Sequence, residues 1–272
     1  MTPTLADITK GILEAYNRRT RKRLGQHFLI DPKVLERIIK AGKLGPDDLV
    51  IEIGSGLGIV TAEIARLVHH VIAIEIDKEL VSISREVLAA RGNINFVAED
   101  ILKVDLAKLA LGRNYKVIGN LPYYITAPIV EKILTAAEKP EIAVLMTQKE
   151  VAERMAAAPG TKKYGSFSVF CQFHARIKLE SFVSKSSFIP WPEVGSAIIS
   201  LIPHTSSLFP GLDEKLFFDL VHAAFQQRRK QLRNSLKDFE VTGAGIDLNR
   251  RPEELSLEEF AALANYCYNS NQ

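Results

Sequence analysis

A short loop rich in glycine is the first part of the sequence whose residue types could do chemistry. Glycines occupy positions 54, 56 and 58, directly after the apolar run Leu49–Ile53. Glycine lets the backbone approach a ligand closely, and a helix that begins after such a loop offers unpaired amide groups. A loop of this kind between a strand and a helix predicts a nucleotide-binding site at one edge of a sheet.

Acidic residues at the ends of the next two predicted strands add detail to this site. Glu75 ends the strand Val71–Glu75, about 20 positions after Gly54, where a carboxylate can accept hydrogen bonds from ribose hydroxyls. Asp100 closely follows a third strand, Ile94–Val97, and is placed to accept a hydrogen from the amino group of adenine. The pattern predicts that a ligand containing adenosine binds here.

The spacing of the glycines distinguishes two kinds of adenosine ligand. A dinucleotide site has the pattern Gly-x-Gly-x-x-Gly, which would need a third glycine at the position of Ile59. The observed Gly-x-Gly-x-Gly, with Glu52 two residues before it, resembles the first motif of S-adenosylmethionine-dependent methyltransferases. Their ligand carries no pyrophosphate. The resemblance implies S-adenosylmethionine as the cofactor, with Gly54 and Gly56 among its contacts.

The segment Asn120-Leu121-Pro122-Tyr123 ends the predicted strand Tyr115–Gly119 and resembles the fourth motif of methyltransferases that act on the amino group of adenine. That nitrogen is a poor nucleophile because its lone pair is delocalised into the ring. The Asn120 side-chain oxygen and the Leu121 carbonyl can each accept one of its hydrogens, which favours a pyramidal nitrogen. Pro122 stiffens the turn, and Tyr123 can stack on the base. The alternative is a simple turn that begins at asparagine.

The whole chain, from about Arg18 to the C-terminal helices, resembles the ribosomal RNA adenine N6,N6-dimethyltransferases, and within them the small-subunit branch, the KsgA family. The opening motif of that family is normally Gly-Gln-Asn-Phe-Leu. The matching segment here, Gly25–Leu29, has His27 in place of the asparagine. By resemblance the cofactor contacts are His27, Leu29, Gly54, Glu75, Asp100 and Asn120.

A second aromatic residue of the expected site belongs to the segment Phe188–Pro192, which resembles the family's Phe-x-Pro-x-Pro motif. By that resemblance Phe188 faces Tyr123 across an adenine that has left its stack. Trp191 and Glu193 replace the more usual proline and lysine. An aromatic residue beside two prolines often only packs in a core, and for Phe188 this alternative stays open.

Basic residues are concentrated in two stretches, although the formal net charge is only +3. Arg18–Arg23 and Arg228–Lys237 each carry five basic residues and no acid. Segregated charge is typical of proteins that bind a polyanion such as RNA, whereas the alternative is a solvated surface. The resemblance to the family adds two basic residues, Lys149 and Arg154, from the segment after the fifth strand. We expect RNA contacts from Arg21, Lys22, Arg23, Lys149, Arg154, Arg228, Arg229, Lys230 and Arg233.

Alternating strands and helices must position these residues. Buried apolar strands that alternate with amphipathic helices predict an α/β fold with a mostly parallel, Rossmann-like sheet. The expected strands are Leu49–Ile53, Val71–Glu75, Ile94–Val97, Tyr115–Gly119 and Ile142–Thr147, with helices over Asp77–Ala90 and Thr126–Ala137. Two further runs, Ile177–Val183 and Ser196–Ile202, are expected to form an antiparallel edge.

The pattern changes after Pro203. Leu212–Ser235 and Ser256–Tyr268 have helical periodicity, and no strand lies between them. We therefore expect a methyltransferase domain over residues 1–203, including a basic N-terminal segment (1–30), and a small all-α RNA-binding domain over residues 204–272. In the second domain Leu232 and Leu236, four residues apart, are expected to pack inward.

Composition excludes several classes of protein. Hydrophobic residues make up 47% and charged residues 25% of the chain, as in ordinary globular proteins. No apolar run approaches the roughly 18 residues that span a bilayer, so we expect no membrane role. Cys171 and Cys267 are the only cysteines, and neither they nor the histidines have zinc-ligand spacing, so no metal is expected. A monomer in the cytoplasm is the default.

The resemblance implies dimethylation of N6 of two adjacent adenosines in the 3′-terminal hairpin of 16S rRNA, within an assembling small ribosomal subunit. The first alternative is an Erm-type 23S rRNA dimethyltransferase, against which Tyr124 and the Gln-Arg-Arg-Lys segment at 227–230 count. The second is a non-catalytic ribosome-assembly or nucleic-acid-binding factor on the same fold, against which the intact motif residues count. A small-molecule methyltransferase would leave the two basic stretches unexplained.

Overall fold

The computed structural model describes residues 3–21, 25–227 and 229–270. Its internal contacts divide the chain into two compact units. Unit 1 consists of residues 1–152 and 178–203, and unit 2 of residues 153–177 and 204–272. The boundary expected after Pro203 lies at one of the points where the chain passes between units. The structure adds that residues 153–177 pack with the C-terminal helices, a grouping that the sequence did not indicate.

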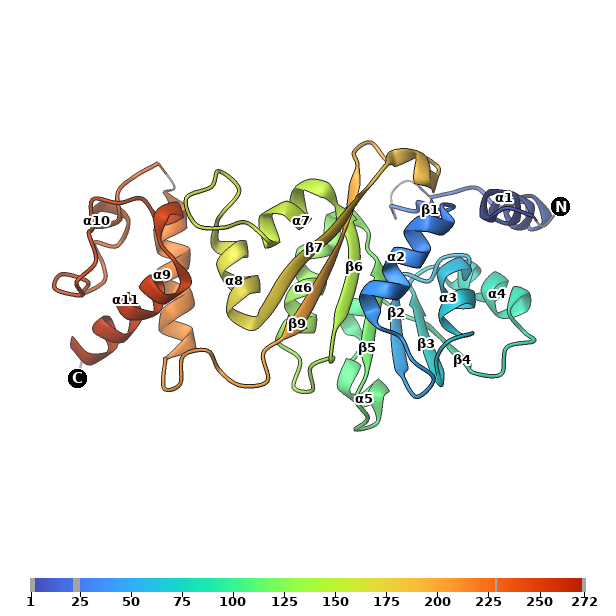
Figure 1. Ribbon diagram of the computed structural model, residues 1–272, viewed down its shortest axis with the longest axis horizontal. Helices are drawn as coiled ribbons and strands as arrows, with labels where there is room; N and C mark the ends of the chain where they lie inside the picture. Colours follow the sequence, from blue (N-terminus) through green and yellow to red (C-terminus); the bar gives the residue numbers. More distant parts are fainter. Residues whose placement is uncertain (1–2, 22–24, 228, 271–272) are drawn as a thin grey trace. The chain divides into compact units, whose positions relative to one another are not determined.

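Unit 1 is built on a seven-stranded sheet of order β4-β3-β2-β5-β6-β9-β7 (Figure 1). All pairings from β4 to β6 are parallel, and β9 joins β6 antiparallel. All five residues of β2 are buried, as expected for a parallel sheet covered on both faces. The predicted α/β class and the antiparallel edge are confirmed. The strands are β2 Leu49–Ile53, β3 His70–Glu75, β4 Ile94–Ala98, β5 Lys116–Asn120, β6 Ala143–Gln148, β7 Ala175–Val183 and β9 Ser196–Pro203.

The order of the strands reverses at β2. From β2 the chain continues outward through β3 to β4, and then returns to β5 on the other side of β2. In open parallel sheets such a reversal opens a crevice at the carboxyl ends of the two central strands, where ligands bind. The glycine loop follows β2 and Asn120 ends β5. The topology therefore brings the two expected motifs to the same crevice.

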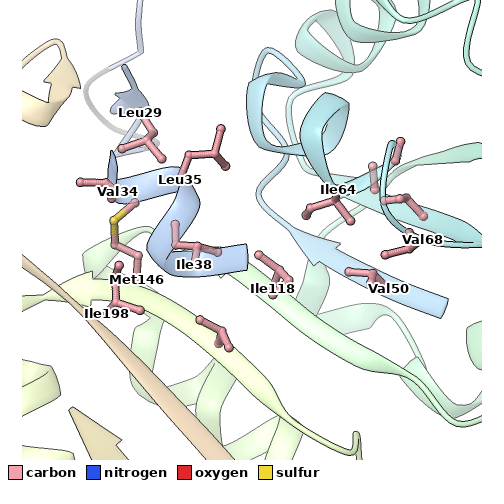
Figure 2. Packing of buried hydrophobic residues seen from close by; sticks show 14 of the residues in the cluster. Leu29, Val34, Leu35, Ile38, Val50, Ile64, Val68, Ile118, Met146 and Ile198 are labelled. Atoms are coloured by element: carbon pink, nitrogen blue, oxygen red, sulfur yellow. The ribbon is translucent and has the colours of Figure 1, made fainter. Parts of the chain in front are cut away.

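Helices of unit 1 cover this sheet. The helix α2 is capped by Asp31, whose carboxylate accepts the amide of Lys33, and Pro32 occupies the first turn. Its apolar side packs on β5, β6 and β9, and Figure 2 shows Val34 beside Met146 in this core. The helices are α1 Leu5–Ala15, α2 Pro32–Gly42, α3 Ile59–Ile64, α4 Lys78–Val87, α5 Leu106–Ala110 and α6 Thr126–Leu134, and α7 Lys149–Met155 follows β6.

A two-stranded ribbon joins an early and a late segment of the unit 1 sequence. The strand β1 (Phe28–Leu29) pairs antiparallel with β8 (Phe188–Ile189) in the register Phe28↔Ile189 and Leu29↔Phe188. The ribbon places the opening motif, Gly25–Leu29, against the motif that begins at Phe188. The two segments are far apart in the sequence, and no periodicity predicted the pairing.

Unit 2 is helical and has its own core of aromatic and aliphatic side chains. The helical periodicity over Leu212–Ser235 belongs to two separate helices in the structure. The first helix ends at Gln226. Farther along, Gln231 is extended, and the amides of Leu232 and Arg233 donate to the carbonyls of a loop at residues 248–250 instead of to a preceding helical turn. Leu232 and Leu236 are buried, as predicted. The helices are α8 Ser166–His174, α9 Glu214–Gln226, α10 Leu232–Ser235 and α11 Leu257–Ser270.

Candidate cofactor and target-base site

A cavity lies at the carboxyl ends of the central strands of unit 1. Its walls come from the opening motif, the glycine loop, the ends of β3 and β5, and the last two residues of η3 (Tyr123–Ile125). Every residue expected to contact the cofactor lines it: His27, Leu29, Gly54, Gly56, Glu75, Asp100 and Asn120. Pro122 also lines the cavity, whereas Leu121 and Tyr123 do not.

The glycine loop needs glycine at two positions, Gly54 and Gly56. Gly54 has φ +77°, and a Cβ there would lie 3.0 Å from the Asn120 carbonyl oxygen. Gly56 has φ +56°, and a Cβ there would lie 3.1 Å from the Phe28 ring. Both positions combine a left-handed backbone with a close neighbour, so any side chain would displace a wall of the cavity.

Glu75 is held with its carboxylate at the cavity. One oxygen accepts the amide of Gly56 at 3.0 Å and the other accepts the amide of Asp77 at 3.0 Å. Burial raises the pKa of this carboxyl above its usual range, and the two backbone donors oppose that shift. A carboxylate has about four lone-pair sites, so two remain for hydroxyl donors after the backbone bonds are made. This geometry fits the two hydroxyls of a ribose.

Asp100 and Ser55 supply further polar atoms to the cavity. The Asp100 carboxylate accepts the amide of Leu102 at 2.9 Å as the cap of η2 (Ile101–Lys103), and its remaining capacity is available to an amino group. The Ser55 hydroxyl is buried and has no partner within the described residues. A buried unpaired hydroxyl on a cavity wall fits a polar ligand. In the sequence, only its place between two glycines distinguishes Ser55 from other serines.

Glu52 lies beneath the glycine loop and does not line the cavity. Its side chain is 2% exposed and accepts a hydrogen bond from the Thr61 hydroxyl of α3. Burial, with a smaller contribution from the charge of Glu75, raises the pKa of the Glu52 carboxyl to about 7. This hydrogen bond connects α3 to β2 just behind the loop.

We expect Glu52→Gln to stabilise the protein at alkaline pH. The folded state has the higher pKa for this acid, so the folded state binds the proton more tightly and stability falls as pH rises from about 4.5 to about 7. Glutamine keeps an acceptor for Thr61 without the charge. In urea unfolding, the free energy of unfolding of the variant relative to that of the wild type should rise by about 3 kcal/mol from pH 4.5 to pH 8. A pH-independent difference would contradict the assignment.

Asn120 is oriented by one hydrogen bond. Its Nδ2 donates to the His27 carbonyl oxygen at 3.0 Å. Because the amide nitrogen is engaged there, the side-chain oxygen is left to accept from a ligand. The amide of Leu121 donates to the Met146 carbonyl at 2.9 Å, which continues the pairing of β5 with β6 by one residue. The segment at the end of β5 is therefore fixed at its first two residues.

Tyr123 stands beside this acceptor. Its hydroxyl lies 2.7 Å from the Ser196 Oγ of β9, and burial raises the pKa of the phenol. Its ring is nearly parallel to that of His27, with 6.2 Å between centroids and 22° between planes. Tyr124, the next residue, is largely exposed and lines the cavity. The target base would therefore meet aromatic side chains where it enters.

Phe188 is not placed where the sequence analysis expected it. It is 1% exposed, belongs to the core cluster that contains Leu29 and Val34, and does not line the cavity. Directly opposite residues of an antiparallel pair point to the same face, so pairing with buried Leu29 turns the Phe188 ring into the core. The structure thus favours the packing alternative and gives Phe188 no open face for a base.

The N-terminal basic stretch makes ion pairs within the chain. The Arg18 side chain is 7% exposed and pairs with Asp77 and Glu79 at the start of α4. Arg21 approaches the same two acids at 3.5 and 3.2 Å, and Gln26 donates to Asp77 at 2.9 Å. These contacts anchor the segment to unit 1 and neutralise part of its charge. Lys22 and Arg23 lie outside the described residues.

The C-terminal basic stretch lines an open groove in unit 2, with a volume of about 1680 Å³. Arg229, Lys230 and Arg233 lie along it, together with Lys237 and Arg251. Arg228 lies outside the described residues. Arg251 was not predicted from the sequence, because it reaches the groove only through the loop at residues 248–250 that pairs with α10. We name this surface the basic groove.

The two remaining RNA-contact candidates are exposed. Lys149 lies at the start of α7 with its ammonium 4.7 Å from the centroid of the Phe182 ring in unit 1, and Arg154 lies with its guanidinium carbon 6.0 Å from the centroid of the Phe167 ring in unit 2.

Across the described ranges, no helix is long and apolar enough to cross a bilayer. The same ranges hold no group of three or more His, Cys, Asp or Glu side chains placed to bind a metal ion.

Comparison with known proteins gives consistent matches. The family model described as "Ribosomal RNA adenine dimethylase" matches residues 17–269. Proteins named "Ribosomal RNA small subunit methyltransferase A" from Bacillus cereus (strain B4264) and Bacillus anthracis (strain A0248) are 42% identical, over 94% of this chain and 94% of each relative.

Two solved structures are similar over nearly the whole chain. A dimethyladenosine transferase from Plasmodium falciparum is 26% identical with a TM-score of 0.78, covering 90% of this chain and 98% of that one. The 23S rRNA methyltransferase ErmE is also 26% identical, with a TM-score of 0.73, covering 89% of this chain and 99% of that one.

Proposed function

This chain belongs to the ribosomal RNA adenine dimethylase family, and from that premise we propose how its residues carry out the reaction. It is an S-adenosylmethionine-dependent adenine dimethyltransferase that acts on 16S rRNA. Its targets are N6 of two adjacent adenosines in the 3′-terminal hairpin of the small subunit. The observation that carries the proposal is the Asn120 amide, whose nitrogen is engaged by His27 while its oxygen is left to accept at the adenosine-type cavity.

The cavity fits S-adenosylmethionine, which when bound supplies an electrophilic methyl group on a sulfonium. The Glu75 carboxylate, held by two backbone amides, accepts the ribose hydroxyls. Asp100 accepts from the adenine amino group, and the buried Ser55 hydroxyl gains a polar partner. The glycine loop provides the close approach that the ligand needs. His27 and Leu29 close the other side.

The end of β5 prepares the target nitrogen. The Asn120 oxygen and the Leu121 carbonyl accept the two amino hydrogens of adenine, which localises the nitrogen lone pair. A nitrogen that already carries one methyl group retains one hydrogen, so one of these acceptors suffices for the second transfer. The proton becomes acidic after transfer, and the reaction needs no strong general base. Tyr123 stacks on the base, which must leave its helix to reach the cavity.

The substrate test is direct. The protein is incubated with labelled S-adenosylmethionine and under-methylated small subunits, free small-subunit RNA or free large-subunit RNA, and the labelled nucleoside is identified after digestion. We expect dimethyladenosine in the small-subunit sample. Label confined to large-subunit RNA would instead support the Erm-type alternative. Binding of subunits without any label would support a non-catalytic assembly factor.

The basic groove binds the RNA phosphates. Contacts to phosphate position a protein without reading sequence, so the shape of the assembling subunit selects the site. The groove residues Arg229, Lys230 and Arg233 are exposed and line one hollow. Further contacts to RNA phosphates come from Lys149, Arg154, the exposed part of Arg21, Lys22, Arg23 and Arg228. We place the enzyme in the cytoplasm as a monomer, and analytical ultracentrifugation would test the second statement.

Replacing Arg229, Lys230 and Arg233 with glutamine should weaken RNA binding and lower its salt dependence. Each phosphate contact contributes about 0.7 to 0.9 to the slope of log affinity against log salt, so three lost contacts reduce the slope by about 2 to 3. Titrations from 50 to 200 mM salt measure it. Lys108→Gln and Lys215→Gln, exposed and outside the groove, serve as charge controls. An unchanged slope would make the groove a solvated surface.

A further inference from the structure

We propose that His27 is a positioning residue for the methyl-transfer step, holding Asn120 and Tyr123 in place for the target base. This role goes beyond contact with the cofactor, and it rests on the proposed function. His27 lies just before β1, and it contacts two segments that are far apart in the sequence, one at Asn120 and Tyr123 and the other at Pro190. The contacts involve its carbonyl, its ring nitrogen and its ring face.

The carbonyl of His27 sets the orientation of the Asn120 amide. It accepts Nδ2 at 3.0 Å, so a flipped amide would place an oxygen against an oxygen. The bond ties the acceptor for the target amino group to the position of the backbone at residue 27. That backbone is itself fixed, since the neighbouring residue Phe28 pairs with Ile189 in the ribbon.

The ring nitrogen of His27 holds the same backbone from the other side. Its Nδ1 lies 2.8 Å from the Pro190 carbonyl oxygen. A carbonyl only accepts, so Nδ1 carries the hydrogen and donates it. Pro190 has no N–H to offer to β1, and extending the register by one position sets it opposite His27. The side-chain bond therefore continues the ribbon at a position where the backbone of Pro190 has no donor.

The ring face of His27 supports Tyr123. The two rings are nearly parallel at 22°, with centroids 6.2 Å apart. The Tyr123 hydroxyl is held by Ser196 at 2.7 Å. The hydroxyl of Tyr123 is thus held by β9, and the His27 ring beside it restricts the movement of the Tyr123 ring. A ring restrained in this way loses less freedom when a base stacks on it.

These contacts also explain why histidine is tolerated where the family's motif normally has asparagine. Both side chains can place an N–H donor two bonds beyond Cβ, so both can reach the Pro190 carbonyl. Only histidine adds a ring beside Tyr123. Two substitutions therefore separate the contacts: His27→Asn keeps the donor and loses the ring, and His27→Phe keeps a ring and loses the donor.

The test measures turnover at saturating cofactor together with cofactor affinity. With under-methylated small subunits, we expect His27→Phe to lower kcat by about tenfold to a hundredfold, since small misplacements of reacting groups have effects of that size. His27→Asn should lower kcat less and raise the KM for the subunit. The cofactor Kd, measured by calorimetry, should rise by a smaller factor than the factor by which kcat falls. His69→Asn, at an exposed position, is the control for losing an imidazole.

Two results would overturn the proposal. One is a cofactor Kd raised tenfold or more with kcat unchanged, which would make His27 a cofactor contact only. The other is an unchanged side-chain amide signal of Asn120 in the NMR spectrum of His27→Phe, with the signal identified by its loss in Asn120→Ala. The NMR measurement needs no RNA, so it tests His27 even if the wild type methylates no ribosomal RNA, a result that would refute the proposed function instead.

Discussion

Replacing Asn120 with alanine is expected to reduce methyl transfer by a factor of at least about 10² to 10³, while the cofactor still binds. The change removes the acceptor that localises the lone pair of the target nitrogen, and preorganised polar groups of this kind contribute such factors to catalysis. The backbone of residue 120 stays in β5, and the glycine loop, Glu75 and Asp100 remain to hold the cofactor. Single-turnover rates and calorimetry on the same preparations measure the two effects.

The control for Asn120 is Asn93→Ala. The Asn93 side chain donates to the carbonyls of Ala65 and Val68 in unit 1 and does not line the cavity, so its loss tests the effect of removing a structural amide. We expect Asn93→Ala to lower stability and leave the rate per folded molecule unchanged. If Asn120→Ala weakened cofactor binding as much as it slowed transfer, Asn120 would be a cofactor contact without the proposed role toward the base.

Glu75→Ala should weaken cofactor binding by about 10² to 10⁴-fold. Each hydrogen bond to a charged group contributes about 1.5 to 3 kcal/mol, and the carboxylate can accept two from the ribose. The change also leaves the amides of Gly56 and Asp77 without their side-chain acceptor, which loosens the glycine loop. Calorimetry with S-adenosylmethionine measures the loss.

Glu63→Gln is the matched control for Glu75. It removes an acid from the surface of α3, where Glu63 pairs only loosely with Arg66, 3.4 Å away. We expect it to leave cofactor affinity unchanged. At saturating cofactor, Glu75→Ala should retain more of its kcat than Asn120→Ala does, because Glu75 does not touch the target base. Wild-type affinity in Glu75→Ala would exclude the ribose contact.

The strands and the cofactor motif were predictable because each depends on neighbours in the sequence. The apolar run Leu49–Ile53 became β2 with the expected bounds. The glycine loop and Glu75, at the ends of adjacent parallel strands, met at one edge because parallel pairing brings the carboxyl ends of strands together. The end of α9 at Gln226 was not predictable, because the helical periodicity of the sequence continues to Ser235. The amides of Leu232 and Arg233 bond instead to the loop at 248–250, which is distant in the sequence.

By itself, the sequence determined the α/β class, the nucleotide-type loop and the motif at Asn120, since hydrophobic period and motif spacing are local properties. Only the tertiary structure decided which way the side chains of those motifs face. It buried Phe188 through pairing with Leu29, engaged Arg18 and Arg21 with Asp77 and Glu79, and placed His27 between Asn120 and Pro190. The physical reason is that burial and hydrogen-bond partners are set by segments that meet only when the chain folds, and spacing along the sequence carries no record of that meeting.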